Sequence, residues 1–133
     1  MKVYIAACGM GLGHVGRCLP IAKRLRELGI EVVFSTYGDA VYEASSAGFK
    51  VYGQDPLLWA EKEDGSVDVK DTLKAWHRYL AIVYRHVESE LKNLLDFSPN
   101  AVLSDSRVST IVAAKMLDLP VISMLHQIKV LLP

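Results

Sequence analysis

The segment from Cys8 to Arg17 reads CGMGLGHVGR and follows an apolar run from Val3 to Ala7. Glycines in such a turn allow positive φ angles and let a ligand approach the main chain. The N–H groups at the start of a following helix favour an anion or a polarised oxygen. His14 adds a side chain that can take up a proton near neutral pH. The segment therefore predicts a binding site with a candidate base, placed after the first strand.

Apolar, β-rich runs alternate along the chain with stretches in which apolar residues recur at helical spacing. This alternation is typical of a parallel sheet with helices on both faces and right-handed crossovers. The sequence therefore predicts an α/β fold, a Rossmann-like doubly wound parallel sheet of five or more strands. The expected strands are 3–7, 31–36, 51–52, 101–103 and 121–125, and the expected helices are 19–28, 40–47, 73–94 and 109–117.

Two of the expected helices have unusual features. Pro20 would lie inside a helix that began at His14, and proline removes one backbone hydrogen bond there. We therefore expect an irregular turn or a later helix start, with His14 on a special loop. The long helix at 73–94 carries one apolar stripe, with Trp76 and Tyr84 expected in a core or interface. Polar residues off the stripe, including His86, are expected to be solvated.

The expected strand order 3-2-1-4-5 makes the first and fourth strands neighbours, and such sheets bind ligands beyond the carboxyl ends of their strands. His14 follows the first strand, and Asp105 follows the apolar part of the fourth. Topology therefore places Asp105 across the crevice from His14, as the partner that orients a base. A second interpretation stays open, because an aspartate before a helix is also a good N-cap.

The bulk composition narrows the class of protein. The chain has 133 residues, 51% of them hydrophobic, which suffices for one compact domain. Its 15 basic and 15 acidic residues balance to a net charge of zero, so we expect no nucleic-acid partner. Cys8 and Cys18 lack the spacing of a redox pair or metal site. We find no membrane span or signal peptide, which predicts a soluble, cytoplasmic protein.

A dinucleotide-binding domain is the main alternative for the glycine-rich turn. Gly11, Gly13 and Gly16 fit the spacing G-x-G-x-x-G of such domains. That fingerprint also requires an acidic residue at the end of the second strand to hold the ribose. Here the first acid is Asp39, which comes late, and this weakens the interpretation as an NAD(P)-binding domain of an oxidoreductase without removing it. A nucleotide P-loop is excluded, because no Gly-Lys-Ser/Thr follows.

Two sets of motifs carry a resemblance to a known family. The first set is GLGHVGR at 11–17, LPIAKRL at 19–25 and GIEVVF at 29–34. The second set is VLSDSR at 102–107, AAK at 113–115 and LPVI at 119–122. Together they resemble the N-terminal domain of GT-B fold glycosyltransferases over nearly the whole chain. The most similar branch includes the bacterial lipid II-forming transferase and related predicted archaeal and bacterial transferases.

The resemblance implies an inverting, hexosyltransferase-type transfer from a nucleotide-sugar to an acceptor hydroxyl, without a metal or a cofactor. In such enzymes the N-terminal domain binds the acceptor. In one branch a histidine after the first strand is the base and an aspartate near the fourth strand is its partner, and His14 and Asp105 match them. In the lipid II branch the glycine loop contacts phosphates of a lipid-linked acceptor, and Gly9, Gly11 and Gly13 match it. The sequence does not choose between the branches.

Three further residues are candidates for substrate binding. Arg17 could offer two donors to a phosphate, although a plain surface arginine is the alternative. His126 and Gln127 follow the fifth expected strand and could contact a sugar or phosphate in the crevice, or belong to an ordinary loop.

The domain organisation follows from the same resemblance. A full GT-B enzyme has a second, donor-binding Rossmann domain, whereas this chain ends shortly after the fifth expected strand. We therefore expect residues 1–133 to form a single N-terminal domain that is inactive alone, either as a fragment or as a half that works with a donor subunit. A third interpretation is a non-catalytic subunit that recruits a lipid-linked acceptor, with peripheral contact to the membrane.

Overall fold

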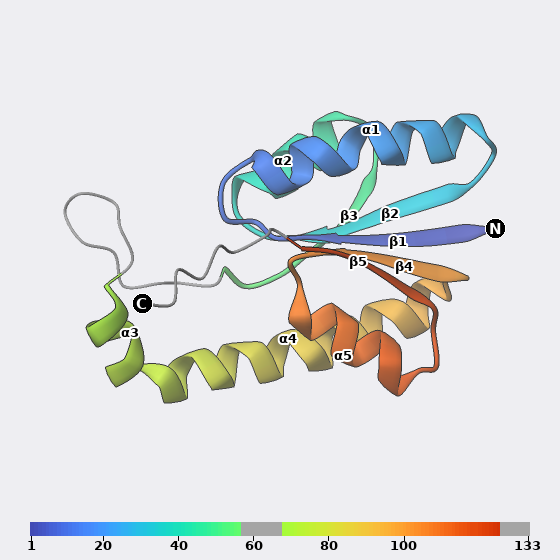
Figure 1. Cartoon of the computed structure of the whole chain (residues 1–133). Helices are drawn as coiled ribbons and strands as arrows, with labels where there is room; N and C mark the ends of the chain where they lie inside the picture. Colours follow the sequence, from blue (N-terminus) through green and yellow to red (C-terminus); the bar gives the residue numbers. More distant parts are fainter. Residues whose placement is uncertain (57–67, 126–133) are drawn as a thin grey trace, which may run out of the picture.

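The computed structural model describes residues 1–56 and 68–125. Its five strands form one parallel sheet in the order β3-β2-β1-β4-β5 (Figure 1), which confirms the predicted Rossmann-like α/β fold. The elements are β1 (Lys2–Ala7), α1 (Gly13–Glu27), β2 (Glu31–Thr36), α2 (Asp39–Ser46), β3 (Lys50–Gly53), α3 (Val69–Lys74), α4 (Trp76–Phe97), β4 (Ala101–Asp105), α5 (Val108–Met116) and β5 (Val121–Met124).

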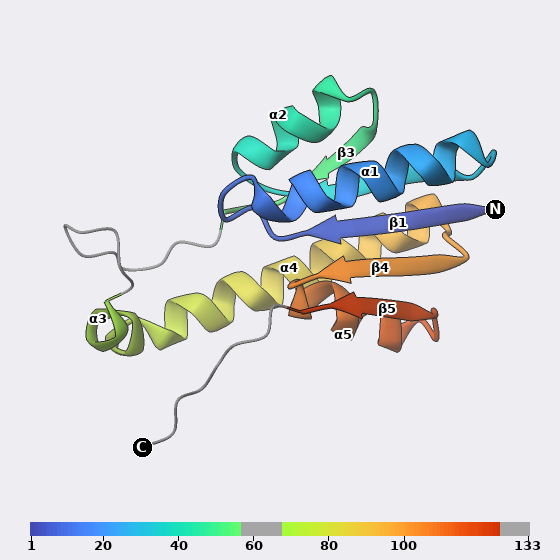
Figure 2. The ribbon, with the colours of Figure 1, turned by 45° about the horizontal axis from the view of Figure 1, so that its top comes forward.

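Helices cover both faces of the sheet, with α1 and α2 on one face and α4 and α5 on the other (Figures 1 and 2). Side chains of β1 alternate between the two faces, as the period of a strand requires. Val3 and Ile5 belong to the core under α1 and α2, and Tyr4 and Ala6 belong to the core under α4 and α5. Burial on both faces explains why β1 is an uninterrupted apolar run in the sequence.

The first helix begins earlier than predicted, so the expectation of a special loop for His14 is wrong. Helix α1 begins at Gly13 and contains Pro20, which places His14 in the first turn. The carbonyl that loses its donor to Pro20 belongs to Gly16, four residues earlier, and the rest of the helix continues around this single missing bond. The predicted end is confirmed. Gly29 has a φ of +80°, and it and Ile30 donate to Arg26 and Leu25 in a Schellman motif.

The long helix predicted at 73–94 is divided into α3 and α4 at Ala75. A break of one residue hardly alters helical spacing, so the sequence pattern cannot reveal it. The N-terminal part of α4, together with α3, projects past the carboxyl ends of the strands (Figures 1 and 2), and no strand of residues 1–56 and 68–125 lies beneath it there. Trp76 and Tyr84 are consequently 58% and 71% exposed, which contradicts the core placement of the prediction, while its alternative, an interface, stays a prediction.

The C-terminal part of α4 lies against the sheet and buries polar side chains. His86 and Glu90 are buried there together with Leu94 and Phe97. The expectation that His86 is solvated is therefore wrong. Its Nε2 atom lies 2.6 Å from the carbonyl oxygen of Asp55, which satisfies the buried ring.

Candidate functional site at the carboxyl ends of β1 and β4

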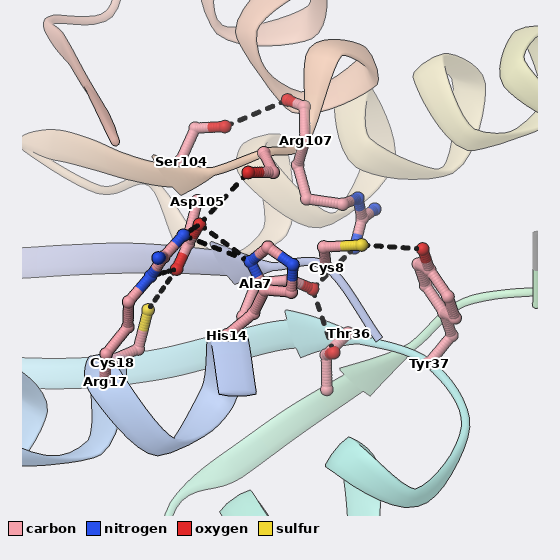
Figure 3. Close-up of polar contacts among 11 residues, drawn as sticks. Ala7, Cys8, His14, Arg17, Cys18, Thr36, Tyr37, Ser104, Asp105 and Arg107 are labelled. Atoms are coloured by element: carbon pink, nitrogen blue, oxygen red, sulfur yellow. Dashed lines mark hydrogen bonds and ion pairs between the residues drawn. The ribbon is translucent and has the colours of Figure 1, made fainter. Parts of the chain in front are cut away.

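The fold brings the first helical turn of α1 against the end of β4. Ala7, the last residue of β1, lies beside Asp105 in the register of the two strands. The N–H group of Cys8 donates to the Asp105 carbonyl oxygen at 3.0 Å, which fixes the start of the glycine-rich turn. His14 then returns to the same place, and its Nδ1 atom lies 2.9 Å from Asp105 Oδ1 (Figure 3). The structure thus brings together the two residues that the sequence placed across the crevice.

Arg17 also binds this carboxylate, a contact that the sequence did not predict. Its Nε donates to Asp105 Oδ2 at 2.5 Å, and its Nη2 donates to Asp105 Oδ1 (Figure 3). Arg17 lies three residues after His14, so both side chains project from one face of the helix. That spacing was a readable signal, but the sequence alone does not say that the shared partner is an aspartate from a distant strand.

Two weaker donors complete the surroundings of the carboxylate. The Ser106 hydroxyl lies 3.3 Å from Oδ1, and the Cys18 thiol lies 3.7 Å from Oδ2. The N-cap of α5 is Arg107, and no side chain makes a capping hydrogen bond there. The alternative role of Asp105 as a helix cap is therefore not the one the structure has.

Burial and charge act in opposite directions on the Asp105 carboxyl. Its side chain has 0% exposure, and burial by itself raises the pKa. The hydrogen bonds from Arg17 and His14, and their charges, outweigh burial and lower the pKa below its usual value. Burial and the neighbouring Asp105 raise the pKa of the Cys18 thiol to about 12. Asp105 is therefore an anion near neutral pH, and Cys18 is a neutral thiol.

The protonation of the imidazole follows from this charge. An ionised carboxylate only accepts hydrogen bonds, so the Nδ1 atom of His14 must carry the proton that Asp105 receives. The distance of 3.2 Å between Arg17 Nη2 and His14 Nδ1 is then the approach of two donors that share Oδ1. In a neutral ring the other nitrogen, Nε2, carries the lone pair that a general base requires.

The glycines of the turn differ in the space around them. A Cβ at Gly9 would lie 2.1 Å from the carbonyl oxygen of Tyr37, so only glycine fits against that backbone. Gly11 has a φ of +73°, which favours glycine, and Gly13 is the first residue of α1. Apart from the adjacent residues and the backbone of α1 itself, no atom of the described residues lies within 4 Å of a Cβ built at Gly11 or Gly13, so the turn is open at both positions.

Two further predictions concern residues at other strand ends. His126 and Gln127 lie outside the described residues. The second strand ends at Thr36, where a dinucleotide-binding domain would hold the ribose with an acid. The Thr36 hydroxyl instead donates to the Ala7 carbonyl oxygen at 2.9 Å, which supports the backbone beneath the glycine turn.

A buried polar cluster behind the site was missed by sequence reasoning. Arg107 Nη2 donates to Glu90 Oε1 at 2.7 Å, and the Tyr4 hydroxyl donates to Glu90 Oε2 at 2.5 Å. Arg107 also donates to the carbonyl oxygen of Ala7, so the cluster holds the strand end from which the glycine turn begins. The sequence did carry one signal for this cluster. The polar residues His86 and Glu90 precede Leu94 at helical spacing, so they lie on the same buried face of α4.

Comparisons with known proteins concern the sequence and the fold of the whole chain. The chain matches no protein-family model. It is 31% identical over 127 residues to an uncharacterized glycosyltransferase of Methanosarcina mazei, covering 96% of this chain and 33% of the relative. The chain thus spans about a third of the length of the curated relatives that it matches.

Solved glycosyltransferase structures share the fold. SsfS6 of Streptomyces sp. SF2575, complexed with thymidine diphosphate, has a TM-score of 0.69 at 20% identity, over 94% of this chain and 38% of that one. MurG of Acinetobacter baumannii has a TM-score of 0.68 at 18% identity, over 93% of this chain and 35% of that one. The chain therefore has a Rossmann-like α/β fold that these solved glycosyltransferases share, and its sequence is similar to about a third of the length of uncharacterized glycosyltransferases.

Proposed function

We propose that this chain is the acceptor-binding half of an inverting glycosyltransferase that uses a nucleotide-sugar donor. The observation that carries the proposal is the His14–Asp105 pair, 2.9 Å apart at the carboxyl ends of the strands and next to an open glycine turn. A base oriented by a carboxylate beside a backbone that can hold phosphates is suited to activating a hydroxyl group.

The proposed reaction uses His14 as the base. Its Nε2 atom accepts the proton of the acceptor hydroxyl while that oxygen attacks the anomeric carbon from the face opposite the leaving group. The bond between the anomeric carbon and the phosphate oxygen breaks, and the nucleoside diphosphate leaves with the electron pair. Asp105 stabilises the imidazolium that forms, and the proton then passes to solvent. The attack inverts the anomeric centre.

The donor would be held outside this chain, by a C-terminal domain or by a partner subunit. The thymidine diphosphate bound in SsfS6, whose fold this domain shares, supports a nucleotide as the leaving group. Gly9, Gly11 and Gly13 are proposed to approach the acceptor's phosphates. Since Arg17 is occupied by Asp105, we assign it a supporting role in the site in place of the phosphate contact first considered.

The acceptor is proposed to be lipid-linked, with the protein at the membrane surface. Within the part of the chain that the structure describes, no helix is long and apolar enough to cross a bilayer. Large apolar side chains nevertheless lie exposed along α3 and the start of α4, flanked by exposed basic residues, as in helices that bind membrane surfaces. The apolar residues are Leu73, Trp76, Leu80 and Tyr84, and the basic residues include Lys70, Arg78 and Arg85.

The test is the substitution His14→Ala in the whole protein that contains this chain. A panel of UDP-, dTDP- and GDP-sugars is offered with a short-chain polyprenyl diphosphate acceptor, and the release of nucleoside diphosphate is measured. Loss of the base should lower turnover by about two orders of magnitude or more, with donor affinity retained. Near-normal turnover would exclude the role of His14 as the base.

The matched control is His77→Ala, which removes an exposed histidine of α4 that does not touch Asp105. Its turnover should remain near that of the wild type. An equal loss in both variants would indicate a general effect of losing a histidine, and would contradict the assignment. Retained acceptor binding without any transfer in the wild type would favour a subunit that only recruits the acceptor.

A further inference from the structure

The buried Asp105 carboxylate has two candidate counter-charges. A buried anion is costly unless a cation compensates it. Arg17 touches both carboxylate oxygens and keeps its charge at all accessible pH values, whereas His14 touches one oxygen and can be neutral or charged. The Asp105 side chain has 0% exposure, so its charge must be compensated by one of these two cations and not by water. If one cation is permanent, the second does not need to be charged.

We propose that Arg17 is the positioning residue of this site, which supplies the counter-charge of Asp105 and thereby keeps His14 neutral and able to accept a proton. This inference rests on the proposed function in one respect, namely that His14 is the base. The charge relation among the three side chains does not depend on it.

The contacts distinguish this role from phosphate binding by Arg17. Its Nε and Nη2 atoms are both engaged on the carboxylate, in the two-point geometry that guanidinium groups form with carboxylates. Hydrogen bonding to Asp105 raises the pKa of Arg17, so the pairing stabilises the charged form of Arg17. The arginine side chain is 35% exposed and that of His14 is 16% exposed, so both lie between the buried anion and solvent.

Removal of Arg17 should change the charge of the imidazole. The carboxylate would lack its permanent partner, and His14 would become an imidazolium to compensate it. An imidazolium has no lone pair for the acceptor's proton, so the base would be lost although both residues of the pair remained. The other titratable groups drawn in Figure 3 are Cys18 of α1, Cys8 after β1, Tyr37 after β2 and Arg107 before α5, and the Arg107 guanidinium is paired with Glu90. Burial raises the pKa of both Cys18 and Tyr37, so neither supplies a charge near neutral pH.

The experiment follows the protonation of His14 directly, by NMR of histidine-labelled protein over a range of pH. The whole protein that contains this chain is used, and the substitution His14→Gln identifies the signal. In Arg17→Gln, the pH at which His14 takes up its proton should rise by about one to two pH units, because a cation has been removed. Arg17→Lys keeps the charge and should lie near the wild type. Asp105→Asn removes the anion and should shift the same titration to lower pH.

Opposite shifts in the Arg17 and Asp105 variants are the expected signature, since a merely structural role would not produce them. No rise in Arg17→Gln, or a rise of equal size in Arg17→Lys, would overturn the proposal. If Arg17→Gln fails to fold by circular dichroism, Asp105→Asn and Arg17→Lys decide, and an unchanged titration in Asp105→Asn would refute the charge relation.

Turnover separates this inference from the proposed function. In Arg17→Gln the transferase should lose activity near neutral pH and regain it at higher pH, where His14 is again neutral. If the wild type transfers no sugar, the proposed function fails, while the NMR titration still tests the role of Arg17. If the wild type is active and the pH profile of Arg17→Gln is unshifted, the inference about Arg17 fails and the proposed function stands.

Discussion

Two buried carboxylates in this domain are each paired with an arginine, but they differ in their access to solvent. Asp105 lies at the end of β4, with partners on α1 that are 16% and 35% exposed. Glu90 lies on α4 under the sheet, and its partner Arg107 is 1% exposed. Similar chemistry therefore occurs twice, once with partners that reach solvent and once inside the core.

The difference concerns what each pair can do. The Glu90 pair is completed by neutral hydroxyl groups of Tyr4 and Ser35, and burial of Tyr4 beside Glu90 raises the pKa of Tyr4. It holds strand ends together inside the core. The Asp105 pair includes a histidine, the type of side chain that most often serves as a general base. A buried ion pair becomes a candidate for catalysis when a titratable third partner reaches solvent.

The largest effect is expected from breaking the inner pair, which is formed by Glu90 and Arg107 in the core. Arg107→Met keeps much of the side-chain volume but leaves Glu90 buried without its cation, which should lower the free energy of unfolding by about 3–5 kcal/mol. Urea denaturation measures this loss. Arg17→Gln should cost clearly less, because His14 can supply the missing charge at Asp105. Equal losses in the two variants would contradict the distinction between the pairs.

A double variant sharpens the same test. Glu90→Gln combined with Arg107→Met removes both charges of the inner pair, and it should recover part of the stability lost in Arg107→Met alone. If the double variant loses more free energy of unfolding than the two single variants together, the cluster is not held by charge compensation.

The next effect concerns Gly9, which packs closely against Tyr37. Gly9→Ala would place a Cβ 2.1 Å from the Tyr37 carbonyl oxygen, and Tyr37 also stacks on Arg107. The backbone must move, which should lower the free energy of unfolding by about 1–3 kcal/mol and reduce turnover in the whole protein. Thermal and urea denaturation measure the loss.

The matched control is Gly16→Ala, inside α1, where nothing lies within 4 Å of the new Cβ among the described residues. Alanine is a better helix former, so this variant should gain about 0.5–1 kcal/mol. Opposite signs for the two alanines would confirm that close approach at Gly9, and not the loss of any glycine, is responsible.

The smallest effect is a pH dependence of the free energy of unfolding. It arises from the outer pair, which is formed by Asp105 with Arg17 and His14. The folded-state pKa of Asp105 lies below its value in the unfolded chain, because the bonds from Arg17 and His14 outweigh burial. Its contribution to stability is therefore present above the unfolded pKa of about 3.9 and is lost as the pH falls through the folded pKa. Asp105→Asn should flatten this acid limb in urea denaturation below about pH 4. An unchanged limb would contradict the assignment.

The sequence was informative where the physical rule is local or periodic. The alternation of apolar runs predicted the five strands, the order common to such sheets predicted their arrangement, and Gly29 predicted a helix end that the Schellman motif confirms. It failed at Pro20, because a helix tolerates one missing hydrogen bond when its remaining bonds and packing persist. It failed again at Trp76, since periodicity shows which residues share a face but not where the sheet beneath ends.

The sequence by itself determined the class of fold and the placement of His14 and Asp105 at one edge of the sheet, because parallel topology brings the carboxyl ends of β1 and β4 together. Only the tertiary structure decided that Arg17 shares Asp105 with His14, and that Glu90 and Arg107 pair inside the core. Such contacts depend on angles and distances between elements far apart in the chain. Spacing along one helix can suggest that two side chains face the same way, but it cannot name the partner that they meet.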